Sequence, residues 1–190
     1  MCPIPRLDDL LDELSEAKTF SKIDLRQSQH HGTPETPREV FFTLIKHNLF
    51  RKLEKCSFMV PEVPFLGYIV SGQGISVDQE KAVAIKPWPT PTNITEARAF
   101  HGLAFFYRRF IINFSAIAAP INECLKKGDF KWTSTTQATF EEIKDRICST
   151  HILVLPDFGK LFEVECDASG VGIWAVLTQE KKPVTFFSEK

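Results

Sequence analysis

The chain has 190 residues, of which 43% are hydrophobic and 25% charged, and its formal net charge is -1 at pH 7. These values are ordinary for a globular protein and exclude a strongly basic chain that binds nucleic acid by bulk charge. The five cysteines include no Cys-x-x-Cys pair, which argues against a disulfide framework or a zinc knuckle. Because the sequence has no long apolar run and no signal-peptide pattern, we expect an intracellular protein of the cytoplasm or nucleus, with no membrane partner.

The first part of the sequence predicts two helices that flank a short strand. Leucines at helical spacing in residues 6–18 predict an amphipathic helix, and FSKIDL at 20–25 predicts a strand that ends near Asp24. The apolar periodicity then breaks in QSQHHGTPETP at residues 27–37, and a second helix is predicted from Thr36 to about Leu49. FLGYIVSGQGISV at 65–77 predicts a hairpin that turns within SGQG, because glycine tolerates positive φ.

The middle of the chain is predicted to be helical and electropositive. Asp78 predicts a helix start, the prolines of KPWPTPT predict an extended linker, and Asn93 with Glu96 predicts a capped helix over about four turns. A short helix is predicted to end near Gly128. Residues 80–131 contain eight basic and four acidic residues, so positive charge concentrates here.

The last sixty residues predict one helix followed by strands. Phe140, Ile143 and Ile147 form a helical stripe, and ILVL, LFEVEC, VGIWAVL and PVTFF predict four strands. In LFEVECDASG, apolar residues alternate with acids up to Asp167, and residues 168–170 are predicted to turn the chain. From the residues alone, this acidic hairpin end is either a solvated surface or one wall of a metal site.

Several stretches together resemble the pol polyprotein of gypsy-type LTR retrotransposons. They are PIPRLDDLLDEL, FSKIDLR, LEKCSF, FLGYIVSGQGISV, WPTPTN, FHGLAFFYRRFI, FSAIAAPI, FKW, FEVECDASGVGIWAVL and PVTFFSEK. The resemblance implies an α+β fold in four parts. These are a reverse transcriptase palm remnant at 1–77, whose catalytic middle is missing at a seam near 26–38; a thumb-like helical segment at 78–130; a connection at 131–157; and the first strands of a ribonuclease H-like antiparallel sheet at 158–190.

The resemblance implies a family activity of RNA-directed DNA polymerisation and RNA–DNA hybrid hydrolysis with Mg²⁺. Asp24 and Asp167 match the first metal-binding acid of each active site, but the sequence has no YxDD pair, and the adjacent Asp8 and Asp9 lie in a predicted helix. Two-metal chemistry needs several converging carboxylates. We therefore read the chain as internally deleted and C-terminally truncated, and expect it to hold no metal tightly and to lack catalytic activity.

The thumb-like part predicts contacts with an RNA–DNA or DNA duplex. Thumb segments hold duplex through phosphates, which requires cations and backbone donors rather than a base sequence. The candidate binding residues are Phe65, Leu66, Gly67, Lys86, Trp88, Arg108 and Arg109. For the arginines, a solvated helix face is an equally good reading, and Phe100, Phe105, Phe106 and Phe110 are expected to be core rather than stacking platforms.

Three hypotheses follow from this reading. The chain is a Pol-derived remnant that has lost both active sites, a non-catalytic nucleic-acid-binding protein, or an enzyme that a partner chain completes by supplying the missing palm.

Overall fold

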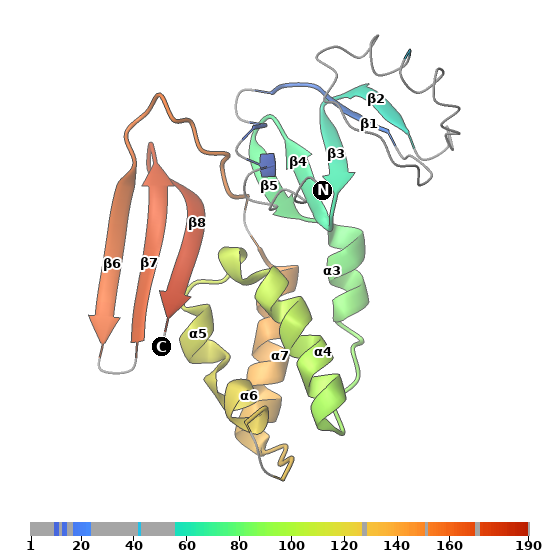
Figure 1. Cartoon of the computed structure of the whole chain (residues 1–190), viewed down its shortest axis with the longest axis vertical. Helices are drawn as coiled ribbons and strands as arrows, with labels where there is room; N and C mark the ends of the chain where they lie inside the picture. Colours follow the sequence, from blue (N-terminus) through green and yellow to red (C-terminus); the bar gives the residue numbers. More distant parts are fainter. Residues whose placement is uncertain are drawn as a thin grey trace.

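The computed structural model confirms the predicted α+β architecture: antiparallel sheets lie beside a group of helices (Figure 1). It describes residues 10, 11, 13, 14, 17–23, 42, 56–126, 129–150, 152–169 and 172–189. The predicted helices at 6–18 and 36–49 lie mostly outside these residues, as do Asp24 and the predicted seam at 26–38. The four-part division of the chain stays a prediction.

The N-terminal part contains two small antiparallel sheets. One pairs β1 with β2, and the other has the order β3-β4-β5. The predicted hairpin turn is confirmed, but the predicted first strand is interrupted by a second turn at Leu66 and Gly67. The additional strand β3 contains Pro64, which an edge strand tolerates because its outer N–H positions need no partner. The strands are β1 (Phe20–Lys22), β2 (Ser57–Val60), β3 (Glu62–Phe65), β4 (Tyr68–Ser71) and β5 (Gly74–Val77).

Two helices begin at the caps that the sequence predicts, Asp78 and Asn93. The Asp78 carboxylate accepts a hydrogen bond from the Glu80 backbone N–H at 3.0 Å, and the Asn93 side chain accepts from Thr95 and Glu96. No helix in the described ranges is long and apolar enough to cross a membrane. The helices are α3 (Gln79–Ile85), α4 (Ile94–Phe106), η2 (Arg108–Phe110), α5 (Phe114–Ile117), α6 (Ala119–Cys124) and α7 (Ser134–Cys148).

One hydrophobic core joins the hairpin β4–β5 to the helices. The rings of Phe100 on α4 and Phe140 on α7 are fully buried, with centroids 4.4 Å apart. Ile143 and Ile147, from the predicted α7 stripe, lie in the same cluster as Tyr68 of β4. Burial of large apolar side chains of this kind contributes roughly 1.5–3 kcal/mol each. The hairpin and the helices therefore form a single packed body.

The C-terminal sheet has the order β6-β7-β8 and stands beside the helices, with β8 nearest to them (Figure 1). Its strands are β6 (Glu163–Ser169), β7 (Gly172–Gln179) and β8 (Lys182–Glu189). Three hydrogen bonds attach β8 to α5: the Ser115 N–H donates to Ser188 Oγ at 2.9 Å, Ser115 Oγ donates to the Ser188 carbonyl at 2.7 Å, and Ser188 Oγ donates to Ser115 Oγ at 3.2 Å. The sheet is thus docked through one edge strand.

Two predictions for the C-terminal part were wrong in detail. ILVL does not form a strand; instead Leu153 makes a single antiparallel bridge with Ile75, at N–O distances of 2.7 and 2.8 Å. This approach requires Gly74, because a Cβ there would lie 2.1 Å from the Leu153 carbonyl oxygen. The predicted turn also starts too early, since β6 runs to Ser169.

The predicted half-buried face of β6 is also corrected. Residues 161–168 are exposed, including Val164 at 65%, because no helix of the described residues packs over this strand. Alternation of apolar and polar residues correctly predicts a strand, but it does not show that another element covers the apolar side.

The cap of α4 generates a prediction about pH. Hydrogen bonds from the Thr92 backbone N–H, the Thr92 hydroxyl and the Asn93 amide lower the pKa of the Glu96 carboxyl. A lowered folded-state pKa stabilises the protein above the unfolded pKa of about 4.3, and this contribution is lost as the pH falls through the folded value. Glu96→Gln should therefore reduce the free energy of unfolding at neutral pH and have little effect in acid. Urea unfolding at both pH values measures this; an equal difference at both would contradict it.

Candidate nucleic-acid interface

The turn between β3 and β4 presents a leucine to solvent on an unusual backbone. Leu66 has φ +48° and Gly67 has φ +88°, so both central residues are left-handed, as in the tight turns that match strand twist. The Leu66 side chain is 59% exposed. A Cβ at Gly67 would lie 3.0 Å from Tyr107 Oη, so glycine is needed for the approach as well as for φ. Phe65 precedes the turn and is half-buried.

Tyr68 attaches this turn to the C-terminal end of α4. The fully buried Tyr68 donates its hydroxyl to the Phe106 carbonyl at 2.9 Å, and its ring stacks on Phe106 with centroids 4.9 Å apart. Tyr107 donates its hydroxyl to the Gly67 carbonyl at 3.3 Å. Burial, with a smaller contribution from Asp78, raises the pKa of Tyr107, so this hydroxyl keeps its proton. The turn is therefore held rigidly against α4.

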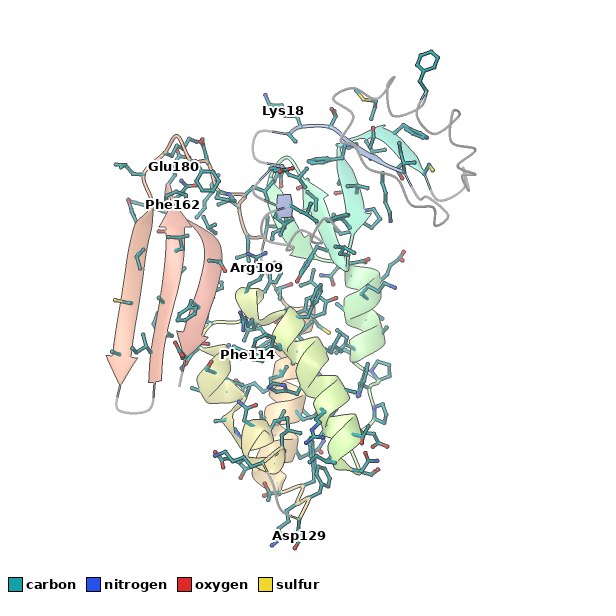
Figure 2. The ribbon with its side chains drawn as sticks, viewed as in Figure 1. Lys18, Arg109, Phe114, Asp129, Phe162 and Glu180 are labelled. Carbon is teal, nitrogen blue, oxygen red and sulfur yellow. The ribbon has the colours of Figure 1, made fainter. Side chains whose placement is uncertain are left out.

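Arg108 and Arg109 begin η2, with only Tyr107 between them and the end of α4. The Arg108 guanidinium lies 3.8 Å from the centroid of the Phe105 ring, and the side chain is exposed. Stacking uses the face of the guanidinium and leaves its in-plane N–H donors available to phosphate oxygens. Arg109 is half-buried where the helices meet the sheets (Figure 2).

A cleft of about 340 Å³ separates η2 from β8. The Phe105 and Phe106 side chains and the two arginines line one side, with Tyr68 among them, and residues 185–188 of β8 line the other. The lining therefore combines aromatic rings with two cations and contains no acidic residue.

The structure places the other two predicted binding residues elsewhere. Lys86 follows α3, with its Nζ 3.9 Å from Asp145 Oδ1 of α7 at an exposed position. Trp88 is half-buried near Phe100, and its carbonyl accepts a hydrogen bond from Lys144 Nζ at 3.3 Å. The structure thus joins the Leu66–Gly67 turn to the end of α4, just before the two arginines in the sequence, and sets Lys86 and Trp88 beside α7. The role of all seven residues in binding stays a prediction.

The expectation that four phenylalanines are core is half correct. Phe100 and Phe110 are buried, but Phe105 and Phe106 are 47% and 40% exposed, because the last turn of α4 borders the cleft. Sequence reasoning also missed Phe187, which is 54% exposed at the cleft. A signal for it existed: consecutive phenylalanines in PVTFF must point to opposite faces of a strand.

The predicted metal-binding acids do not form a cluster within the described residues. Asp167 is exposed on β6 opposite Trp174, and Glu163 and Glu165 precede it on the same face. In the described ranges, no three His, Cys, Asp or Glu side chains lie close enough to hold a metal ion together. Reverse transcriptases and ribonucleases H use paired divalent ions, which several carboxylates must clamp. Asp167 and its described neighbours do not fit such a site, and Asp24 lies outside the described residues.

Comparisons with known proteins place the chain among transposon Pol proteins. Residues 132–190 match the RNase H-like domain found in reverse transcriptase. The Pol polyprotein from transposon 297 of Drosophila melanogaster is 42% identical over 78% of this chain and 14% of its own length. The gypsy polyprotein of the same species is 37% identical over 96% of this chain and 19% of its own length. An uncharacterised mitochondrial protein of Arabidopsis thaliana, AtMg00860, is 40% identical over 59% of this chain and 72% of its own length.

The chain spans less than a fifth of either Pol polyprotein. Its alignment with gypsy extends over 204 positions, more than the 190 residues of the chain, so that polyprotein contains segments with no counterpart here.

Solved structures show the same fold. A foamy viral protease-reverse transcriptase in complex with dsDNA superposes with a TM-score of 0.70 and 26% identity, over 80% of this chain and 33% of that one. The same kind of enzyme in complex with an RNA/DNA hybrid superposes with a TM-score of 0.68 and 24% identity, over 95% of this chain and 26% of that one.

The β3–β4 turn generates a stability prediction. Gly67→Ala should lower the free energy of unfolding by about 1–2 kcal/mol, because alanine is strained at positive φ and its Cβ would crowd Tyr107. Gly72→Ala is the matched control, since its nearest neighbours lie at 3.6 Å. Urea denaturation of the three proteins measures the difference. Equal stability of the two variants would show that the turn is not held as described.

Proposed function

Because the chain belongs to the Pol polyproteins of retrovirus-related transposons and carries their reverse transcriptase/ribonuclease H-like fold, we propose that it binds primer–template duplex without catalysing its synthesis or cleavage. The observation that carries this proposal is the attachment of the Leu66–Gly67 turn to the end of α4, beside Arg108. A rigid turn with a cation close to it in the sequence suits the sugar-phosphate backbone, which is bound without reference to base sequence.

The charge distribution supports duplex binding. Although the whole chain has a net charge of -1, the segment 80–131 is positively charged, with eight basic and four acidic residues. Arg108 and Arg109 belong to this segment. Relatives of known structure were solved with dsDNA and with an RNA/DNA hybrid. Duplex of either type is therefore the partner that we propose for this surface.

The residue inventory supports the absence of catalysis by this chain alone. Phosphoryl transfer with two metal ions requires carboxylates from several segments to converge on one pocket. In the polymerase part, Asp24 is the single acid that matches the family pattern, and the sequence contains no other adjacent aspartates than Asp8 and Asp9. In the ribonuclease H-like part, Asp167 is the single match, and it is exposed. One carboxylate at each place does not clamp two Mg²⁺ ions.

Primer extension tests the catalytic half of the proposal. The purified full chain, given a primer–template, deoxynucleotides and either Mg²⁺ or Mn²⁺, should yield no extended primer, while an active retroviral reverse transcriptase in the same mixture should yield product. Extended primer that depends on Asp24, and is lost in Asp24→Asn, would contradict the proposal.

Fluorescence anisotropy with a labelled duplex tests the binding half. Affinity should fall steeply as salt is raised, and Arg108→Ala should weaken binding and reduce the slope of log K against log salt by about 1, the loss of one phosphate contact. Arg98→Ala is the matched control, because Arg98 is also exposed but lies about 15 Å earlier along α4. Equal effects of the two substitutions would contradict the proposed surface.

A further inference from the structure

We propose that the cleft between η2 and β8 binds an unpaired nucleotide adjoining the duplex, with its base on Phe187 and its phosphate on Arg108. This inference rests on the proposed function in one respect: the bound duplex delivers its single-stranded end to the cleft. It adds a subsite for single-stranded nucleic acid to a surface otherwise suited to phosphate backbone.

The volume of the cleft favours a single nucleotide. Its volume of about 340 Å³ lies at the small end of the ~300–1,000 Å³ range of small-molecule sites. Both walls are fixed: Tyr68 is fully buried behind Phe106, and the Ser115–Ser188 hydrogen bonds hold β8 against α5. A cleft of this volume suits one nucleotide rather than a base-paired helix.

Phe187 provides a stacking surface at this cleft. Its side chain is 54% exposed, and within the described part of the chain its ring contacts no other aromatic ring. Bases stack on exposed aromatic rings with little sequence preference, since every base has a π-face. An exposed ring at the edge of a small cleft is therefore a platform for an unpaired base.

The opposite wall provides the positive charge. The Arg108 guanidinium is oriented by its stacking on Phe105 at 3.8 Å, so its N–H donors are directed before any ligand arrives. Arg109 lines the same cleft, and none of the lining residues is acidic. An aromatic platform opposite oriented cations is the combination that single-stranded nucleic acid requires.

Anisotropy measurements with three probes test this inference on the full chain. The probes are a blunt duplex, the same duplex with a short oligothymidine overhang, and the oligothymidine alone. The overhang should strengthen binding by about tenfold, the gain that stacking of one base provides. Phe187→Ser should remove this gain and leave blunt-duplex affinity unchanged. Phe158→Ser is the matched control, because Phe158 is 67% exposed outside the cleft and its loss should not reduce the gain.

The outcomes separate this inference from the proposed function. If blunt duplex binds and the overhang adds nothing, the cleft proposal is wrong and duplex binding stands. If the overhang gain persists in Phe187→Ser, the unpaired base binds elsewhere and the proposal is again wrong. If blunt duplex fails to bind but oligothymidine binds in a Phe187-dependent manner, duplex binding and delivery by a duplex are wrong, and the cleft binds single-stranded nucleic acid by itself. Absence of binding to all three probes overturns both.

Discussion

The burial of Tyr68 is the contact on which the arrangement of the interface depends. Its ring packs between Phe106 and Phe110, and its hydroxyl satisfies the last carbonyl of α4, so a strand and a helix 38 residues apart share one anchor. A buried hydroxyl without a hydrogen-bond partner would cost free energy. The burial of Tyr68 therefore depends on its hydrogen bond to the Phe106 carbonyl. The Leu66–Gly67 turn, the exposed Arg108 and the floor of the cleft all take their positions from this contact.

Further contacts attach the C-terminal sheet to that body. The Ile75–Leu153 bridge joins the connection to the hairpin, the Val154 N–H donates to the Pro183 carbonyl of β8, and Ser188 joins β8 to α5. These attachments hold β8 beside η2, where the cleft lies. Its lining therefore comes from two segments that lie far apart in the sequence, and only their docking places the Phe187 ring opposite the cations of η2.

Features with a local signal could be predicted from the sequence, and features that depend on docking could not. Asn93 and Glu96 correctly predict the start of α4 because capping is a matter of neighbouring residues. The Leu66–Gly67 turn was missed because a leucine gives no local signal for the positive φ that Leu66 adopts, and one glycine within an apolar run is compatible with a continuous strand. The alternation of side chains along a strand places Phe186 and Phe187 on opposite faces of the sheet. Which of the two faces stays exposed depends on how β8 docks on α5, through Ser115 and Ser188, which are 73 residues apart. The separation of Trp88 from Arg108 likewise follows from tertiary packing alone.

Amide hydrogen exchange of the full chain, with and without primer–template duplex, is the most direct test of the central claim that the turn and the arginines form one binding surface. The account predicts that duplex slows exchange together at residues 65–68 and 105–109, while residues 86–88 and strand β6 are unchanged. Slowed exchange confined to residues 86–88 or to β6, with none at the turn, would contradict it.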